Sequence, residues 1–149
     1  MNRRITVWEY QDRISTLLLA WNALNILIGL VLGRSRKPLN RGIATQNVGW
    51  GVINIGIALI GALVSRRRKA TLPDPYRADV LHKESRSLWR LLAINAGLDL
   101  LYIAGGSRLL DTLNVYRRGM GFGIMIQGFV LFVWDVLLLA FFPEDSDRS

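Results

Sequence analysis

The sequence predicts an all-α fold, a polytopic membrane four-helix bundle. Three observations indicate this class. Hydrophobic residues make up 51% of the 149-residue chain, and they are gathered into four blocks instead of recurring with the period of a soluble amphipathic helix. The longest blocks exceed the roughly 20 residues that a helix needs to cross a bilayer. Lys and Arg flank the blocks and are absent from their interiors, as is typical of spanning helices.

The blocks define four predicted spans in a single transmembrane domain, residues 1–149: residues 14–33, 42–65, 91–106 and 119–142. Thr6 and Glu9 have the spacing of a capping box, so the first helix is expected to begin near Thr6. The third span is short and follows a polar segment, residues 74–90, whose apolar residues share one helix face. Asp74 and Pro75 predict the N-cap and first turn of this amphipathic surface helix, which is expected to run into the third span.

The composition excludes several kinds of site. The chain has no cysteine and one histidine, His82, so it has no disulfide framework, thiol chemistry or histidine metal cluster. Gly119, Gly121 and Gly123 open a helix but follow no strand, so they do not form a dinucleotide fingerprint and are expected to mediate close helix packing. No nucleophile–base pair stands out. We therefore predict that the protein is not an enzyme and has no catalytic residues, metal or cofactor.

The net charge of +8 would indicate nucleic-acid binding in a soluble protein, but here the basic residues lie beside apolar blocks. We therefore predict contact with the lipid bilayer and its anionic headgroups, and no nucleic acid. The side that holds both termini carries 12 Lys and Arg, against 7 on the opposite side, which favours cytoplasmic termini. The run Arg66, Arg67, Arg68 and Lys69 is interpreted as a stop-transfer and orientation signal or, alternatively, as a binding site for an anionic lipid headgroup.

The two halves of the chain resemble each other. Residues 18–23 (LLAWNA) align with residues 91–96 (LLAINA), and the same offset places Gly33 on Gly106. After a gap of four residues, an Arg-Gly pair opens the second span of each half. Each half is then a two-span hairpin. Because each unit has two spans, both copies are expected to have the same orientation in the membrane, as a parallel repeat.

Small and polar residues recur at intervals of three and four inside the spans, which places them on one face of each helix. These faces comprise Ser15, Asn22, Asn25, Gly29 and Gly33; Asn47, Gly51, Asn54, Ala58, Gly61 and Ser65; Asn95, Asp99, Tyr102 and Gly106; and Gly121, Gln127, Gly128 and Asp135. Small residues allow close approach of helices in lipid, and amides hydrogen-bond across them. The faces therefore predict packing seams, with Leu, Ile, Val and Phe turned to lipid.

Seven of these residues form a predicted midplane polar site: Asn22, Asn25, Asn54, Asn95, Asp99, Gln127 and Asp135. Its two carboxylates need partners or protons, because a charge in mid-membrane costs about 2.5–3.5 kcal/mol. Counting from the span midpoints predicts a hydrogen bond from Asp99 to Gln127 or to an asparagine. Asp135 lies nearer the termini, where an ion pair with Arg86 or Arg90 is expected. For Asp99, a structural hydrogen bond and a proton or cation site are both open.

The asparagines of the first span, the Arg118-Gly119-x-Gly121 motif, and Gln127-Gly128 followed by Asp135 resemble a family of small four-span bacterial inner-membrane proteins of unknown function. The resemblance covers most of residues 14–142. It implies a location in the bacterial inner (cytoplasmic) membrane and no assigned activity. In size and span count the chain is also similar to small multidrug exporters, but their essential glutamate lies in the first span, and residues 14–33 contain no acid.

Two functions are compatible with these features. The first is a non-enzymatic membrane protein whose polar seams mediate packing and assembly, within the chain, with a second copy or with another membrane protein. The alternative is a small transporter or proton-coupled carrier, in which Asp99, Gln127, Asn25 and Asn54 line a midplane site. The two hypotheses differ in Asp99: a packing residue tolerates replacement by asparagine, whereas a coupling residue loses its function while the fold survives.

Overall fold

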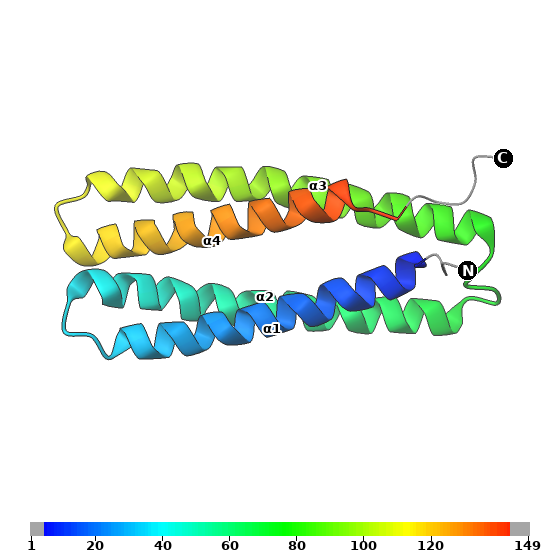
Figure 1. Cartoon of the computed structure of the whole chain (residues 1–149), viewed down its shortest axis with the longest axis horizontal. Helices are drawn as coiled ribbons and strands as arrows, with labels where there is room; N and C mark the ends of the chain where they lie inside the picture. The colour runs from blue at the N-terminus through cyan, green and yellow to red at the C-terminus, as the bar shows by residue number, and fades with distance from the viewer. Residues whose placement is uncertain (1–4, 144–149) are drawn as a thin grey trace.

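The computed structural model describes residues 5–143 as four long helices joined by short loops (Figure 1). The helices are α1 (Val7–Gly33), α2 (Pro38–Thr71), α3 (Ala78–Arg108) and α4 (Val115–Ala140), with a 3-10 turn, η1 (Leu109–Asp111), before α4. All four helices are long and apolar enough to cross a membrane. The described residues contain no strand. The predicted all-α membrane bundle is therefore confirmed.

Two helix starts follow local sequence signals. The Thr6 side chain accepts a hydrogen bond from the Glu9 backbone N–H, and the Glu9 carboxylate accepts one from the Thr6 backbone N–H at 3.0 Å. The predicted capping box is therefore confirmed, and it satisfies two backbone donors at the start of α1. Pro38 occupies the first turn of α2, where the missing N–H of proline leaves no helical bond unmade.

Asp74 does not cap a helix, contrary to the prediction. Its carboxylate accepts a hydrogen bond from the Tyr76 backbone N–H at 3.1 Å, and α3 begins only at Ala78. The short side chain of an aspartate competes with the helix for nearby backbone groups, and this local bond holds the linker in a turn. From Ala78 the helix continues without a break to Arg108, so the surface segment does run into the third span as predicted.

Helices α1 and α2 form one hairpin, and α3 and α4 form a second hairpin beside it (Figure 1). Both hairpin loops lie at one end of the bundle, called here the loop end. The start of α1, the end of α4 and the α2–α3 linker lie at the opposite, terminal end. Helix α4 also packs along α2, but no Cα atoms lie within 8 Å of each other between α1 and α4 or between α2 and α3 in the described chain. The space between α1 and α4, and that between α2 and α3, is therefore bridged by side chains and not by close backbone approach.

Glycines bring α2 and α4 into backbone contact at the loop end. A Cβ atom on Gly42 would lie 2.7 Å from the Met120 nitrogen and 2.9 Å from the Gly119 carbonyl carbon. A Cβ on Gly123 would meet the Gln46 side chain of α2. Gly121 brings α4 equally close to α3, because a Cβ there would lie 2.7 Å from the Gly106 oxygen. Only glycine allows such an approach at these positions. The three glycines that open the fourth span therefore mediate close packing, as predicted.

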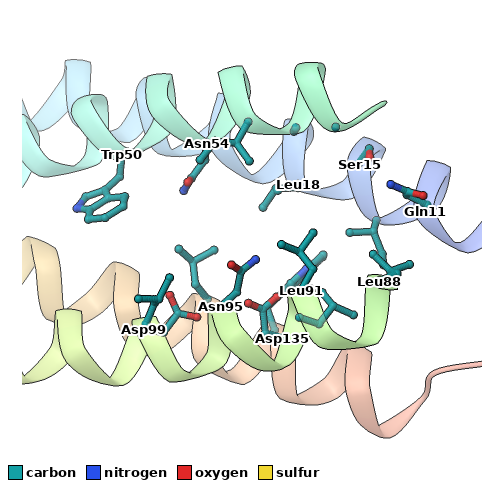
Figure 2. A pocket seen from close by; sticks show the side chains of 18 of the residues that line it. Gln11, Ser15, Leu18, Trp50, Asn54, Leu88, Leu91, Asn95, Asp99 and Asp135 are labelled. Atoms are coloured by element: carbon teal, nitrogen blue, oxygen red, sulfur yellow. The ribbon is translucent and has the colours of Figure 1, made fainter. Parts of the chain in front are cut away.

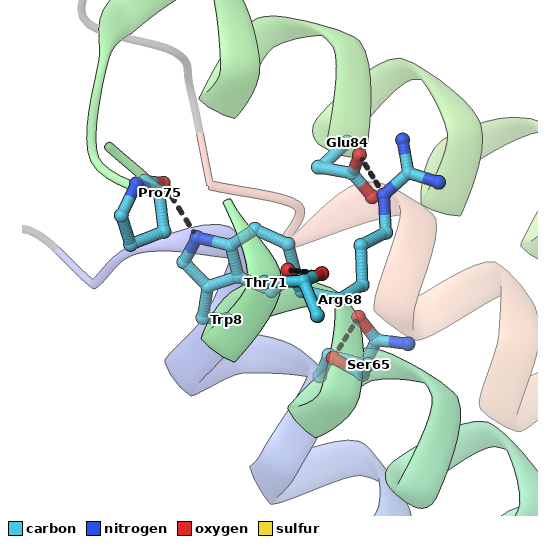
Figure 3. A network of polar contacts seen from close by, with 7 residues as sticks. Trp8, Ser65, Arg68, Thr71, Pro75 and Glu84 are labelled. Carbon is cyan, nitrogen blue, oxygen red and sulfur yellow. Dashed lines mark hydrogen bonds and ion pairs between the residues drawn. The ribbon is translucent and has the colours of Figure 1, made fainter. Parts of the chain in front are cut away.

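Trp8 closes the terminal end of the bundle. Its side chain is buried against Val7, Leu88 and Leu92, which joins α1 to α3. Figure 3 shows its indole Nε1 donating to the Pro75 carbonyl oxygen at 2.9 Å, which also ties α1 to the α2–α3 linker. Hydrogen bonds satisfy the polar end of a buried indole while its ring contributes apolar contact.

Large apolar side chains cover the outside of the four helices. Val31 and Ile60 are each 65% exposed and Leu101 is 67% exposed, whereas the asparagines inside the predicted spans of α1 and α2 and both span carboxylates are buried. This distribution is the reverse of a soluble bundle and is that of a protein surrounded by acyl chains. The predicted inward faces of α2 and α4 therefore lie in the interior, and so does that of α1 except for Gly33, which is exposed at the end of the helix. Tyr102 and Asn95 of α3 are more exposed than the prediction requires.

Candidate functional site

A layer of carboxamides joins three helices in the middle of the bundle. The Asn25 and Gln127 side chains exchange two hydrogen bonds, from Asn25 Nδ2 at 3.0 Å and from Gln127 Nε2 at 2.9 Å. Gln127 Nε2 also donates to Asn47 Oδ1 at 3.1 Å. All three side chains are buried. The layer links α1, α2 and α4, and its buried donors and acceptors satisfy one another.

A second amide pair lies one to two turns nearer the terminal end. Asn54 Nδ2 donates to Asn22 Oδ1 at 3.3 Å, and Asn22 Nδ2 donates to the Leu18 carbonyl oxygen at 2.7 Å. Asn22 is fully buried. Together with Asn25, Asn47 and Gln127, these residues form what we call the amide layer. Asn47 belongs to the predicted face of α2 but not to the predicted polar site; its spacing of seven residues from Asn54 was the signal for it.

The two carboxyls lie outside the amide layer. Asp99 is 4% exposed and Asp135 is 8% exposed. Among the described residues, the predicted hydrogen bond between Asp99 and Gln127 or an asparagine is not formed. The Gln127 amide is already engaged by Asn25 and Asn47. Asp99 Oδ2 is a buried oxygen with no hydrogen-bond partner. Buried polar atoms without partners are rare, and each one calls for an explanation such as a bound proton, an ordered water or an ion.

The ion pair predicted for Asp135 is not formed either. Within residues 5–143, neither Arg86 nor Arg90 makes a salt bridge with it. Both arginines lie on the exposed face of α3, and an Arg86 nitrogen lies 3.3 Å from His82 Nε2. Asp135 comes from α4 and faces the interior instead. The direction in which each residue of α3 points decides whether its arginines can reach Asp135. That direction can be assigned only when the rotation of the helix in the bundle is known.

Asp99 and Asp135 line a cavity of about 300 Å³, which we call the carboxylate cavity. Figure 2 shows Asp99, Asn95 and Asp135 along one wall, with Asn54 and Trp50 opposite. All four helices contribute to the lining: Gln11, Ile14, Ser15 and Leu18; Trp50, Asn54, Ile57, Ala58 and Gly61; Leu88, Leu91, Leu92, Asn95, Leu98, Asp99 and Tyr102; and Leu131, Trp134 and Asp135. None of these side chains is basic. The predicted site residues Asn54, Asn95, Asp99 and Asp135 thus meet in one place.

The carboxylate cavity opens to the side of the bundle between α2 and α3. Its lining residues Ile57, Leu91 and Leu98 are 60%, 53% and 40% exposed on the outer surface. Towards the loop end, the rings of Trp50 and Tyr102 meet edge to face with centroids 4.7 Å apart. The sequence could not identify this pair as partners, because the two residues lie on different hairpins. The opening faces the apolar surface that surrounds the bundle.

The basic run in the last turns of α2 is only partly available to headgroups. The Arg68 side chain donates to Glu84 of α3 at 2.6 Å, as Figure 3 shows, and Lys69 Nζ lies 5.2 Å from the centre of the Tyr76 ring. Arg66 lies 3.8 Å from Asp12, with both side chains largely exposed. Arg67 is exposed. Among the four predicted headgroup residues, Arg68 therefore joins α2 to α3 through its ion pair with Glu84.

The two hairpins make equivalent contacts at positions separated by a constant 77 residues. A Cβ on Gly29 would lie 3.0 Å from the Ala44 oxygen, and a Cβ on Gly106 would lie 2.9 Å from the Gly121 oxygen. Likewise a Cβ on Gly51 would lie 3.1 Å from the Asn22 oxygen, and one on Gly128 would lie 3.1 Å from the Asp99 oxygen. Asn22 and Asp99 therefore occupy equivalent backbone positions.

This correspondence corrects the alignment of the first helices. The sequence match of residues 18–23 with residues 91–96 pairs Asn22 with Asn95, but the contacts pair it with Asp99, four residues further on. Four residues are about one helical turn, so the same faces are matched in both alignments. The sequence alignment was fixed by the repeated Leu-Leu-Ala residues. The contacts between the helix backbones depend instead on the positions of the glycines, and these give the other alignment.

These features define a polytopic α-helical membrane protein with a buried carboxyl site. The chain belongs to the Family of unknown function (DUF6992), whose model matches residues 17–136. The matched region includes the amide layer and both carboxyls of the cavity. Comparison with curated proteins found no match, and comparison with solved structures found none either.

Proposed function

We propose that the protein is a small cation-binding membrane carrier whose binding groups are the carboxyls of Asp99 and Asp135. The observation that carries the proposal concerns Asp99, a residue of the cavity wall. Its Oδ2 atom is buried and has no hydrogen-bond partner. An isolated charge in mid-membrane costs about 2.5–3.5 kcal/mol, so such a carboxyl is stable when it holds a proton or lies against a cation. The site therefore favours uptake of one positive charge.

The charge balance of the carboxylate cavity supports a cation. Asp99 faces it from α3 and Asp135 from α4; among the described lining residues the only other titratable one is Tyr102, and α1 and α2 contribute no charged group to it. Two ionised carboxylates in one cavity of low dielectric repel each other strongly. A bound proton or monovalent cation removes that repulsion, so exchange of one for the other is the chemistry that the residues support.

The equivalence of the hairpins gives independent support. At the positions 77 residues earlier, the first hairpin carries Asn22 in place of Asp99 and Ala58 in place of Asp135. Neutral residues therefore satisfy the same packing geometry, and the fold does not require acids there. We interpret the hairpins as an internal duplication of parallel orientation, in which the second copy acquired or kept the carboxyls.

The packing hypothesis fits the amide layer better than the carboxylate cavity. Asn25, Asn47 and Gln127 bond to one another, and none of them lines the carboxylate cavity, so we assign them to holding the helices together. We infer a non-enzymatic carrier in which the amide layer is scaffold and the carboxyls are the site. The excess of Lys and Arg near the termini supports cytoplasmic termini. We further propose that the membrane is the bacterial inner membrane, as the family resemblance implies.

The test is labelling of the full-length protein in lipid nanodiscs with a hydrophobic carbodiimide, which reacts with protonated carboxyls inside a membrane. Mass spectrometry of peptides locates the adduct. We expect labelling at Asp99 or Asp135 that decreases as the pH is raised and decreases when a binding cation is added. Asp111→Asn, an exposed acid outside the cavity, is the matched control and should leave the labelling unchanged.

Two variants copy the first hairpin into the second, Asp99→Asn and Asp135→Ala. Both should keep the size-exclusion profile of the wild type, because the first hairpin packs with these residues. The double variant should lose all labelling within residues 91–106 and α4, which contain no other acid. Absence of any adduct at either residue in the folded wild-type protein would overturn the proposal.

A further inference from the structure

We propose that the carboxylate cavity binds a small lipophilic organic cation, which reaches it from the bilayer through the opening between α2 and α3. This inference rests on the proposed function and names the class of its cargo. Three features of the cavity support it: the chemistry of its walls, its volume, and the positions at which it is closed and open.

The walls suit a cation with an apolar body. Apart from the two carboxyls, most lining side chains are leucine, isoleucine and aromatic residues, and the carboxyls lie together on one wall. Trp50, Tyr102 and Trp134 add aromatic rings, which attract cations over their faces. A multivalent metal ion needs several oxygen ligands, and the described residues contain no group of three acids or histidines that could hold one. An organic cation needs only charge neutralisation and apolar contact.

The volume limits the cargo to a small molecule. A cavity of about 300 Å³ is at the lower end of the range for small-molecule sites in proteins. It accommodates about one aromatic ring with a short ammonium substituent.

Contacts close the bundle at both ends of the cavity. At the terminal end, Trp8 packs on Leu88 and Leu92 and is tied to Pro75. At the loop end, Gly42 and Gly119 bring α2 and α4 into backbone contact. Among the described residues, these contacts therefore leave no straight path into the cavity along the bundle axis.

The sides of the bundle differ. Between α1 and α4, side chains fill the gap, because Asn25 bonds to Gln127 and the Tyr10 hydroxyl donates to the Leu138 carbonyl at 2.6 Å. Between α2 and α3 the rim is formed by exposed Ile57, which lies in the part of α2 that faces lipid. A lipophilic cation concentrates in the bilayer, so this side is where it would meet the cavity.

The first experiment compares two ligands of the same shape. Benzyltrimethylammonium carries the charge, and neopentylbenzene, in which carbon replaces the nitrogen, does not. With full-length protein in nanodiscs, we expect saturable calorimetric binding of the cation, protection of Asp99 from carbodiimide labelling by the cation, and neither effect with the neutral analogue. Asp99→Asn should weaken cation binding at least tenfold, and Asp111→Asn should not change it.

The outcomes separate the two proposals. If Na⁺ protects Asp99 but benzyltrimethylammonium neither binds nor protects, the lipophilic cargo is overturned while the cation carrier stands. If Asp99 and Asp135 are never labelled, the carrier itself fails. If the neutral analogue binds as tightly as the cation, the site is an apolar pocket and the role of the carboxyls is overturned.

The second experiment tests the route. Ile57→Trp places a larger ring at the rim of the opening, and Leu63→Trp adds the same ring to the exposed surface of α2 away from the cavity. We expect the association rate of the cation to fall several-fold in the Ile57 variant only. Equal rates in the two variants would show that the cation reaches the cavity elsewhere and would overturn the lateral route.

Discussion

The two hairpins have the same backbone contacts and different polar groups. In the first, Asn22 receives a hydrogen bond from Asn54 across the hairpin. In the second, the equivalent residues are Asp99 and Leu131, and the Asp99 Oδ2 atom has no partner. The comparison teaches that glycines set the distance between helices, while the polar residues beside them can be exchanged. The equivalent contacts therefore do not require a carboxyl at this position, which is the basis of the proposed cation site.

The two sides of the bundle repeat this contrast. Asn25 and Gln127 bridge α1 to α4 by hydrogen bonds, whereas the residues at the equivalent positions, Tyr102 and Trp50, bridge α3 to α2 by an aromatic contact. The first side is closed by amides that satisfy each other. The second is held beside the cavity by this pair of rings and, at the terminal end, by the Arg68–Glu84 ion pair.

The largest effect is expected when the first hairpin is given the acid of the second. Asn22→Asp places a carboxylate at a fully buried position, against the Leu18 carbonyl oxygen that now accepts the Asn22 amide. We expect the free energy of unfolding in mixed micelles to fall by about 3 kcal/mol. Titration with sodium dodecyl sulfate measures it. A loss no larger than that of Asp99→Asn would contradict the contrast between the hairpins.

Removal of the central amide should have the next largest effect. Gln127→Leu removes three hydrogen bonds and leaves Asn25 and Asn47 without their partner. Because such bonds contribute about 0.6 kcal/mol each in membrane proteins and unpaired buried amides add a further cost, we expect a loss of about 2 kcal/mol. The same detergent titration measures it. Ile126→Leu, at the adjacent exposed position, should remain like the wild type.

Equivalent glycines should respond equally. A Cβ on Gly29 would lie 2.7 Å from a Val48 side-chain carbon, and a Cβ on Gly106 would lie 2.9 Å from one of Met125. We expect Gly29→Ala and Gly106→Ala each to lower the unfolding free energy by about 1.5 kcal/mol, because overpacking forces the helices apart.

Two other glycines provide the control for this pair. A Cβ atom added at Gly49 or at Gly97 would meet no other atom within 4 Å. Gly49→Ala and Gly97→Ala should therefore lose no stability and should gain from the higher helix propensity of alanine. Thermal unfolding followed by circular dichroism distinguishes the pairs. A strong effect at Gly29 with none at Gly106 would break the proposed equivalence of the hairpins.

The smallest change in stability is expected at the candidate site itself. Asp99→Asn removes no hydrogen bond in which Oδ2 takes part, and it supplies the residue found at the equivalent position. We expect the free energy of unfolding to stay within about 0.5 kcal/mol of wild type, since only substitutions that disturb packing or pairing are costly. Carbodiimide labelling of the same sample should be lost at this residue. A large loss of stability would indicate that the Asp99 carboxyl stabilises the fold and is not a binding group.

Several features of the fold were predictable because they depend on local chemistry. The capping box of Thr6 and Glu9, the four apolar spans and the glycine contacts of the fourth helix each follow from neighbouring residues. The partners of buried polar groups were not predictable. Gln127 bonds to Asn25 and Asn47 instead of Asp99, because helix rotation and crossing angle choose among several amides at similar depth.

By itself, the sequence determined that four apolar helices form, where the first of them begins, and which faces most of them turn inward, because hydrophobic transfer and helical periodicity act along one chain. Only the tertiary structure decided that Asp99 is left unpartnered beside Asp135, and that the cavity they share opens between α2 and α3. The reason is geometric. Pairing of buried groups depends on distances between hairpins that glycine contacts fix to within a few tenths of an ångström, and no one-dimensional pattern contains those distances.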